Sequence, residues 1–269
     1  MPSIWNQQGP AIIGDAADDL LGISVALSAD AKTLVVGAPG YNENTEKIGY
    51  VKVYRADEDG GDRVQLGETI YGDAVGDYFG TSVDISSDGN TLVIGSPGYY
   101  DNYDRPGYEI RPGYVRVFSL ESSDDLDTGS WKQIGEDIVG EAIGDEFGSS
   151  VSLSEDGKTI AVGANYNNGN GDDSGHVRVY RLDESGSSWM QLGEDIDGEA
   201  AGDLFGVSVS LSADGKTVAV GAPAAGKDQV WTGQVRVYRI DSEGSSWEPL
   251  GQSIYGDNEN DWFGQSVNI

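Results

Sequence analysis

The sequence has no cysteine and only one histidine, His176, among its 269 residues. Without cysteine the chain has no disulfide framework and no thiol chemistry, although this does not exclude an extracellular location for a protein with a large core. A single histidine cannot supply a histidine-based catalytic dyad or a histidine-rich metal site. We therefore assign no catalytic residue. Carboxylate-pair chemistry is the one enzymatic class that stays open, because acidic side chains are abundant.

Basic side chains are also scarce. The chain has 16 Lys and Arg against 46 Asp and Glu, a formal net charge of -30. Such a surface repels nucleic acid and anionic membrane, so neither is expected as a partner. The sequence contains no long apolar run of the kind that crosses a membrane, which predicts no membrane insertion.

No stretch shows a sustained helical period, and a short motif recurs instead. The motif is Phe-Gly-x-Ser-Val, and its glycines are Gly80, Gly148, Gly206 and Gly264, with a degenerate copy at Leu21-Gly22. Successive glycines are 58, 68, 58 and 58 positions apart. A period of this size predicts one supersecondary unit repeated along the chain, with a ten-residue insertion in one copy.

Each repeat carries four short segments typical of β-strands. In the third copy they are residues 147–154, 159–164, 176–180 and 189–193, and an Asp-Gly pair separates the first two, as in a tight hairpin. We call them the first to fourth strands. Four antiparallel strands repeated about an axis form a propeller blade. The predicted fold is an all-β β-propeller with four-stranded antiparallel blades, comprising four full 58-residue repeats plus partial terminal strands.

We treat residues 1–269 as a single repeat array with repeat units at about 14–71, 72–139, 140–197 and 198–255, and a partial unit at 256–269. The chain then begins with a lone fourth strand, Trp5 to Ile13, and ends with a lone first strand, Phe263 to Ile269. Two interpretations are open: the ends pair with another copy, or the chain is a piece of a longer repeat protein. An open repeat end would leave a strand edge free to pair.

The motif resembles a known family. About fifteen residues after each Phe-Gly comes a Gly-Ala-Pro-like triplet: Gly37-Ala38-Pro39, Gly95-Ser96-Pro97, Gly163-Ala164-Asn165 and Gly221-Ala222-Pro223. This pattern resembles the FG-GAP repeat of integrin-α-like β-propellers. The resemblance implies an extracellular or cell-surface protein active in cell adhesion, scaffolding or carbohydrate binding. It does not imply a particular ligand.

The chain departs from that family at the calcium loop. Metal-binding members carry an Asp-x-Asp-x-Asp-Gly loop between the first and second strands, but here the loop is Ser-x-Asp-Gly with a single carboxylate. We therefore expect no metal site and no cofactor. The run Asn168-Gly-Asn170-Gly-Asp172 has alternating oxygens without a bidentate glutamate, so it would bind calcium only loosely.

Three residue types recur at fixed places in the repeats. The aspartate two positions before each Phe-Gly is expected to cap its own turn, although a cation-binding acidic ring is the alternative. The tryptophan of the fourth strand is expected to be buried between blades. A lysine or arginine in each third strand is expected to pack its stem between blades and pair its head with a carboxylate. The third-strand cations are Lys52, Arg116, Arg178 and Arg236.

Strand direction reverses at every turn, so two sets of loops emerge on one face, which we call the upper face. They are the connections from second to third strand and from fourth strand to the next first strand, and the former vary most in sequence and length. Variable loops on a constant scaffold are the usual place for binding. Aromatic residues are concentrated there, with polar neighbours suited to a glycan or a protein. The candidate ligand-binding residues are Tyr99, Tyr100, Tyr103, Arg105, Tyr108 and Trp231.

The sequence thus predicts a non-enzymatic, extracellular or cell-surface binding, adhesion or assembly module whose upper face recognises a glycan or a protein. One alternative is a carbohydrate-active enzyme, a lyase or glycosidase, with an upper-face carboxylate pair. The other is a structural repeat that self-associates through its unpaired end strands.

The tyrosine-rich loop provides a direct test of this hypothesis. Replacing Tyr100, Tyr103 and Tyr108 together by alanine should abolish binding on a glycan or surface-protein array, because aromatic faces carry much of the contact energy at such sites. The melting temperature should change by only a few degrees. A large loss of stability with binding retained would assign these rings to packing instead.

Overall fold

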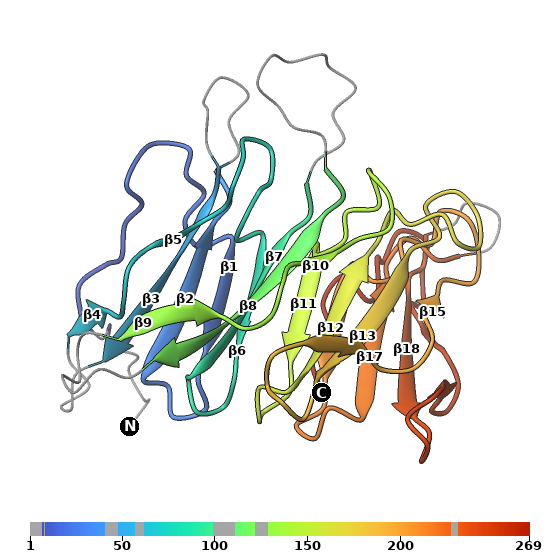
Figure 1. The fold of residues 1–269 in the computed structure, drawn as a ribbon. Coiled ribbons are helices and arrows are strands. Elements are labelled where there is room, and N and C mark those ends of the chain that lie inside the picture. The colour runs from blue at the N-terminus through green and yellow to red at the C-terminus, as the bar shows by residue number, and fades with distance from the viewer. Residues whose placement is uncertain are drawn as a thin grey trace, which may run out of the picture.

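The computed structural model describes residues 7, 9–40, 48–56, 62–98, 111–121, 129–226 and 231–269. Over these residues the chain forms β-strands and connections in four antiparallel sheets, with no helix and hence no helix able to cross a membrane. Figure 1 shows the sheets following one another in chain order. The predicted all-β propeller architecture with four blades is confirmed.

Every sheet repeats one plan, in which a first, second and third strand pair consecutively and two short segments then both pair with the third. The first strands are β1 (Ser24–Leu27), β6 (Ser82–Ile85), β11 (Ser150–Leu153) and β16 (Ser208–Leu211). The second strands are β2 (Thr33–Ala38), β7 (Thr91–Ser96), β12 (Thr159–Ala164) and β17 (Thr217–Ala222). The third strands are β3 (Tyr50–Ala56), β8 (Tyr114–Glu121), β13 (His176–Leu182) and β18 (Gln234–Ile240).

The fourth strand is interrupted, and here the prediction of one continuous strand is wrong. Its first segments are β4 (Arg63–Gln65), β9 (Ser130–Gln133), β14 (Trp189–Gln191) and β19 (Trp247–Pro249). Its second segments are β5 (Ile70–Tyr71), β10 (Ile138–Val139), β15 (Ile196–Asp197) and β20 (Ile254–Tyr255). The break contains a glycine at positive φ in every blade, such as Gly193 at 76°, and a residue in that conformation cannot continue an extended ladder.

Neither of the two terminal strands predicted from the sequence is present in the described residues. Residues 9–13 carry no strand, and Trp5 lies outside the described residues. Residues 263–269 are also outside any strand, because no second strand lies beside them to complete a ladder. They nevertheless follow the path of a further first strand: Ile269 donates its backbone N–H to Ser210 Oγ (3.1 Å), as Leu211 does to Ser152 Oγ (3.0 Å).

The blades pack through their innermost strands and through the Phe-Gly motif. β1, β6, β11 and β16 are neighbours in that order. The phenylalanines Phe79, Phe147 and Phe205 are fully buried. The motif glycines share one conformation, since φ is 90° at Gly80, 93° at Gly148, 94° at Gly206 and 91° at Gly264. The expectation that they occupy equivalent backbone positions is confirmed, although they precede the strands, because positive φ interrupts extended backbone.

The close contact between blades involves a second glycine, in the second strand. A Cβ on Gly163 would lie 2.1 Å from the Gly206 carbonyl oxygen of the next blade and 2.4 Å from Ser150 Oγ. Ser150 Oγ donates a hydrogen bond of 2.7 Å to that carbonyl. The same serine-to-carbonyl bond joins Ser24 to Gly80, Ser82 to Gly148 and Ser208 to Gly264. The position of the second-strand glycine therefore admits no side chain.

The ten-residue insertion is divided between two connections of the second blade. The connection from β7 to β8 spans residues 97–113, whereas the equivalent one from β12 to β13 spans only 165–175. Trp131 follows Tyr114 by 17 positions, whereas Trp189 follows His176 by 13. The second blade thus keeps the core of the repeat and adds residues only where strands are joined.

Replacing Gly163 by alanine should lower the free energy of unfolding by about 3 kcal/mol, because the new methyl group cannot be accommodated without separating two blades. Gly202→Ala is the matched control. Its φ is 81° and nothing lies within 4 Å of the added Cβ, so it should cost only about 1 kcal/mol of backbone strain. Urea denaturation of both variants measures the difference, and equal losses would contradict the packing argument.

Candidate functional site

The upper face brings together the loops that the sequence predicted to meet there. Gly49 forms a bridge with Phe79, and Gly233 forms the equivalent bridge with Phe263. Each bridge places the second-to-third connection of one blade beside the chain entering the next. Of the predicted ligand-binding residues, Trp231 is described; Tyr99, Tyr100, Tyr103, Arg105 and Tyr108 lie outside the described residues.

Trp231 is paired on this face with a second tryptophan, Trp262. Their ring centroids are 5.4 Å apart, the planes are inclined at 63°, and the residues are 43% and 41% exposed. In the preceding blade the same two positions are Asp173 and Leu204. Sequence reasoning missed Trp262, and the signal that could have found it is its place immediately before Phe263-Gly264. The residue before each Phe-Gly motif has positive φ and lies on the upper side of the repeat.

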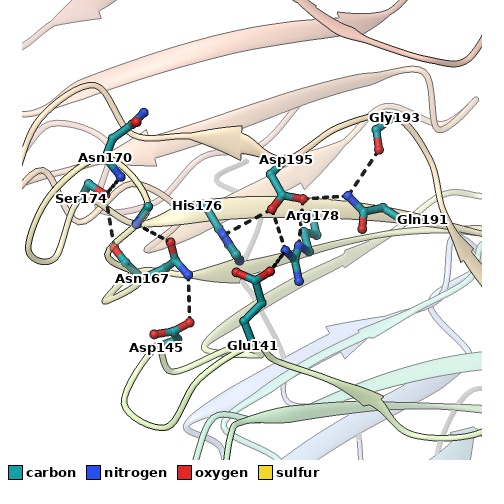
Figure 2. Close-up of polar contacts among 11 residues, drawn as sticks. Glu141, Asp145, Asn167, Asn170, Ser174, His176, Arg178, Gln191, Gly193 and Asp195 are labelled. Atoms are coloured by element: carbon teal, nitrogen blue, oxygen red, sulfur yellow. Dashed lines mark hydrogen bonds and ion pairs between the residues drawn. The ribbon is translucent and has the colours of Figure 1, made fainter.

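A polar cluster lies in the third blade (Figure 2). Arg178 on β13 donates from Nε to Asp195 Oδ1 (2.8 Å) and pairs with Glu141 as well. Asp195 comes from the break in the fourth strand, and Glu141 from the connection that enters the blade. His176 stands two positions before Arg178, with Nδ1 4.0 Å from Asp195 Oδ2. The guanidinium therefore joins three separate segments of the upper half of this blade.

The electrostatics of the cluster follow from burial and from Arg178. Burial alone would raise the pKa of Asp195, but hydrogen bonds and charge from Arg178 outweigh it and hold that pKa below its usual value. His176 is almost fully buried, and this desolvation, with Arg178 adding to it, lowers the pKa of its imidazole. At neutral pH the imidazole is thus uncharged, and it takes no part in the ion pairs that Arg178 forms with Asp195 and Glu141.

Glu141, His176 and Asp195 offer ligand atoms within 4.8 Å of one another, as a metal site would. The residues do not fit a cation, because the guanidinium of Arg178 already satisfies both carboxylates and would lie beside the ion. The third-strand cations of the other blades also pair with carboxylates, so the predicted pairing is confirmed. The pairs are Lys52 with Asp15, Arg116 with Asp73 and Asp137, and Arg236 with Glu199.

The aspartates before the Phe-Gly motif close turns, as expected. Asp77 Oδ2 accepts from the backbone N–H of Ala74 (2.9 Å) and from the Tyr114 hydroxyl (3.0 Å). Asp145 instead accepts from Asn167 Nδ2 (2.8 Å), which anchors the loop of residues 165–175. These bonds hold the carboxylates in turns rather than in an acidic ring. In that loop, Asn168 Oδ1 accepts from Asp173 N (2.8 Å), so one of the candidate calcium oxygens supports loop backbone.

The fourth-strand tryptophans lie between blades, as predicted. Trp131, Trp189 and Trp247 donate their indole N–H to the carbonyls of Leu66, Ile134 and Leu192, respectively, in the preceding blade. The rings are buried or half-buried. These residues are therefore packing elements and not ligand platforms.

Glu146 is the most perturbed carboxyl group of the upper face. It directly precedes Phe147, its φ is 55°, and burial followed by the charge of Asp173 raises its pKa to about 7. A carboxyl group with such a pKa can exchange a proton at neutral pH. Composition alone could not identify it among 46 acidic residues.

Two further hollows lie away from the upper face. A groove of about 570 Å³ runs between the first two blades, beside Gln65, Thr69 and Trp131. Another, of about 510 Å³, lies among the Asp-Gly hairpins and is bordered by Asp88 and Asp214. The hairpin aspartates accept from their own loops: Asp88 Oδ1 accepts from Ser86 Oγ (2.6 Å) and Asp214 Oδ1 from Ser212 Oγ (2.7 Å). They are turn-forming residues.

Comparison with known proteins supports the fold. Residues 140–180 match the family model described as FG-GAP repeat. Among curated proteins no sequence matches. Similar solved structures include two described as putative 6-phosphogluconolactonases, from Bacteroides uniformis (TM-score 0.57, 13% identity, 94% of this chain and 61% of the other) and Bacteroides fragilis (0.54, 13%, 95% and 60%). The Dos1 propeller is also similar (0.43, 15%, 85% and 46%).

The chain thus spans about 60% of the length of the first two structures, and at this identity they show the fold alone. Together with the four repeated sheets, the comparisons define the class of the protein as a β-propeller. Residues 140–180 carry an FG-GAP repeat, in keeping with the resemblance in the sequence.

Replacing His176 by glutamine, the residue at this position in the fourth blade, should remove a pH dependence of stability. The folded-state pKa of His176 is lowered, so below about pH 6.5 the unfolded chain binds a proton that the folded chain resists, and stability decreases as the pH is lowered. Glu146 has a raised pKa and acts in the opposite direction between its ordinary value and about 7. The difference between wild type and variant in urea midpoints at pH 8 and pH 5 isolates the histidine. An unchanged difference would contradict its neutral state.

Proposed function

We propose that the protein is a non-enzymatic binding or adhesion module that engages a glycan or a protein through its upper face, outside the cell or at its surface. The single observation that carries the proposal is the pair of exposed tryptophans, Trp231 and Trp262. Neither ring is needed to join the blades, because the buried fourth-strand tryptophans have that role.

Large aromatic rings left in water lose the free energy that burial of their apolar surface would provide. A tryptophan removes more apolar surface from solvent than any other side chain, and a fixed pair of rings presents a rigid contact surface with little entropy to lose on binding. The two rings form a cleft-like angle of 63°. Sugar rings and partner side chains stack on such surfaces, and tryptophan is enriched among residues that dominate binding energy.

The surroundings favour a neutral or cationic ligand. With a formal charge of -30, the protein repels anionic polymers at long range and attracts basic groups. Arg116, Arg178 and Arg236 in the third strands already have carboxylate partners, so these three offer no free cationic site to an anionic sugar. We therefore expect neutral glycans, amino sugars or a basic protein surface as the partner.

A second candidate is an acid-base enzyme centred on Glu146 and Asp173. The observation in its favour is the pKa of about 7 at Glu146, which suits a general acid. Similar folds described as putative 6-phosphogluconolactonases give a substrate to test. A phosphorylated lactone is anionic, however, and the acidic protein would repel it. This candidate would be supported if the protein hydrolysed a lactone or released reducing ends from a polysaccharide, and if the Glu146→Gln variant lost that activity.

Replacing Trp231 and Trp262 together by alanine should weaken binding by at least about 30-fold, or about 2 kcal/mol, because both rings would lose their stacking contacts. Binding is first measured on an array of neutral glycans, amino sugars and surface proteins. Each ligand that the wild type binds is then titrated with the wild type and with the double variant. The melting temperature should change by only a few degrees, since both rings are exposed.

Met190→Ala is the matched control, because Met190 is an exposed apolar residue on β14, away from the upper face. It should leave binding unchanged. Equal binding by wild type and the double tryptophan variant would overturn the proposal, and so would a wild type that binds nothing while it hydrolyses a lactone or polysaccharide.

A further inference from the structure

The first blade exposes an apolar face whose equivalents in the other blades are covered. Ile23, Val25 and Leu27 on or beside β1 are 59%, 61% and 49% exposed. Their equivalents in the second blade include Val83 and Ile85, at 8% and 6%, and those in the fourth include Val209 and Leu211, at 8% and 5%. The difference arises because β6, β11 and β16 each pack on the preceding first strand, whereas none of the described segments covers β1.

The Phe-Gly position of the first repeat shows the same open space. Gly22 has the motif conformation, with φ of 94°, yet nothing lies within 4 Å of a Cβ built on it. At Gly80 and Gly148 that Cβ would meet the preceding blade at 2.9 Å. The backbone of the first repeat is therefore already shaped for a neighbour. Leu21 replaces the phenylalanine of the other repeats, and so needs a smaller pocket in that neighbour.

The opposite end of the array presents the complementary surface. Residues 263–269 follow the fourth blade as a lone inner segment, and Phe263 and Ile269 are exposed. Phe263 is 39% exposed, whereas the equivalent Phe205 is 1% exposed. The segment lies where a first strand packs, because Ser208 Oγ donates to Gly264 O (2.8 Å) and Ser210 Oγ accepts from Ile269 N (3.1 Å).

The polar groups that join consecutive first strands are also present on this segment. Ser150 bonds to the next glycine carbonyl, and Ser152 accepts from the backbone N–H of Leu211. Asp84 takes the accepting role one blade earlier, toward Leu153 N (2.7 Å). In the lone segment these positions are Ser266 and Asn268, a hydroxyl donor and an amide acceptor, and both residues are exposed.

We propose that a second copy of this chain packs head to tail on the first blade. The segment Phe263–Ile269 of one copy lies along β1 of the other. Ser266 donates to the carbonyl of Gly22, Asn268 accepts from the N–H of Leu27, and the apolar face of Ile23, Val25 and Leu27 is covered. The contact continues an interface that the chain itself repeats from blade to blade, so it requires no new kind of surface. It uses the ends of the array and is independent of the upper-face ligand site.

The first experiment measures mass in solution. Sedimentation equilibrium of residues 1–269 from about 1 to 100 µM should give masses above the 28.5 kDa of one chain, rising with concentration. Val25→Asp should return the protein to one chain mass, because the charge would have to be buried in the contact. It should leave the melting temperature of the single chain unchanged, since Val25 is exposed there.

Val64→Asp is the matched control. Val64 is 53% exposed on β4, and the equivalent residues of the other blades, such as Met190, are exposed as well. The same substitution there should leave association intact. A single chain mass across the whole concentration range would overturn the proposal and would assign the exposed face to further sequence outside these residues. Association that survives Val25→Asp would also overturn it.

The absence of native cysteine allows a second test of direction. Asn268→Cys and Leu27→Cys variants, mixed under mild oxidation, should form a disulfide-linked pair that contains one chain of each, because the two positions face each other only in a head-to-tail contact. Each variant oxidised alone should form little disulfide-linked dimer. Dimers of Asn268→Cys alone at the level of the mixture would indicate a tail-to-tail contact and contradict the proposal.

Discussion

The contact between two glycines of neighbouring blades is the constraint on which the rest of the structure depends. The second-strand glycine, such as Gly163, lies against the carbonyl of the Phe-Gly glycine of the next blade, Gly206, with no room for a Cβ. The serine of the first strand then reaches that carbonyl. Because the inner strands are held this closely, the phenylalanine beside each motif glycine is driven into the space between blades, where Phe147 and Phe205 are fully buried.

This contact also explains why every repeat has the same register although the loops differ. The innermost strands are fixed by backbone approach, and the apolar second and third strands follow from it. Farther from the axis, the strands are no longer held by this glycine contact. The fourth strand breaks at a positive-φ glycine, and the break supplies acids such as Asp137 and Asp195 to the third-strand arginines. Arg116 and Arg178 each join the break to the connection that enters the blade, which stabilises the upper half of the sheet.

The strong acidity of the protein is compatible with this arrangement because the third-strand cations Lys52, Arg116, Arg178 and Arg236 each pair with a carboxylate. Arg116 and Arg178 are each shared by two carboxylates, so the carboxylates nearest to the core are compensated. Other acids, such as Asp156 and Asp214, lie in turns where Ser and backbone donors hold them. The upper-face loops are thereby left without a structural role in the core, and side chains such as Trp231 are free to differ between repeats.

The period of Phe-Gly motifs by itself determined the repeat, the strand order and the number of full repeats, because glycine and phenylalanine at a fixed spacing report a backbone contact repeated in every copy. The caps of Asp77, the buried tryptophans and the cation pairs were predictable for the same reason. The tertiary structure alone decided what depends on neighbours that are distant in sequence. The pairing of Trp231 with Trp262 arises where two loops converge, and the raised pKa of Glu146 depends on its burial and on the charge of Asp173, 27 positions further along the chain. Whether a first strand is covered also depends on the blade beside it, so Val25 and Val209 have the same local sequence pattern and opposite exposure.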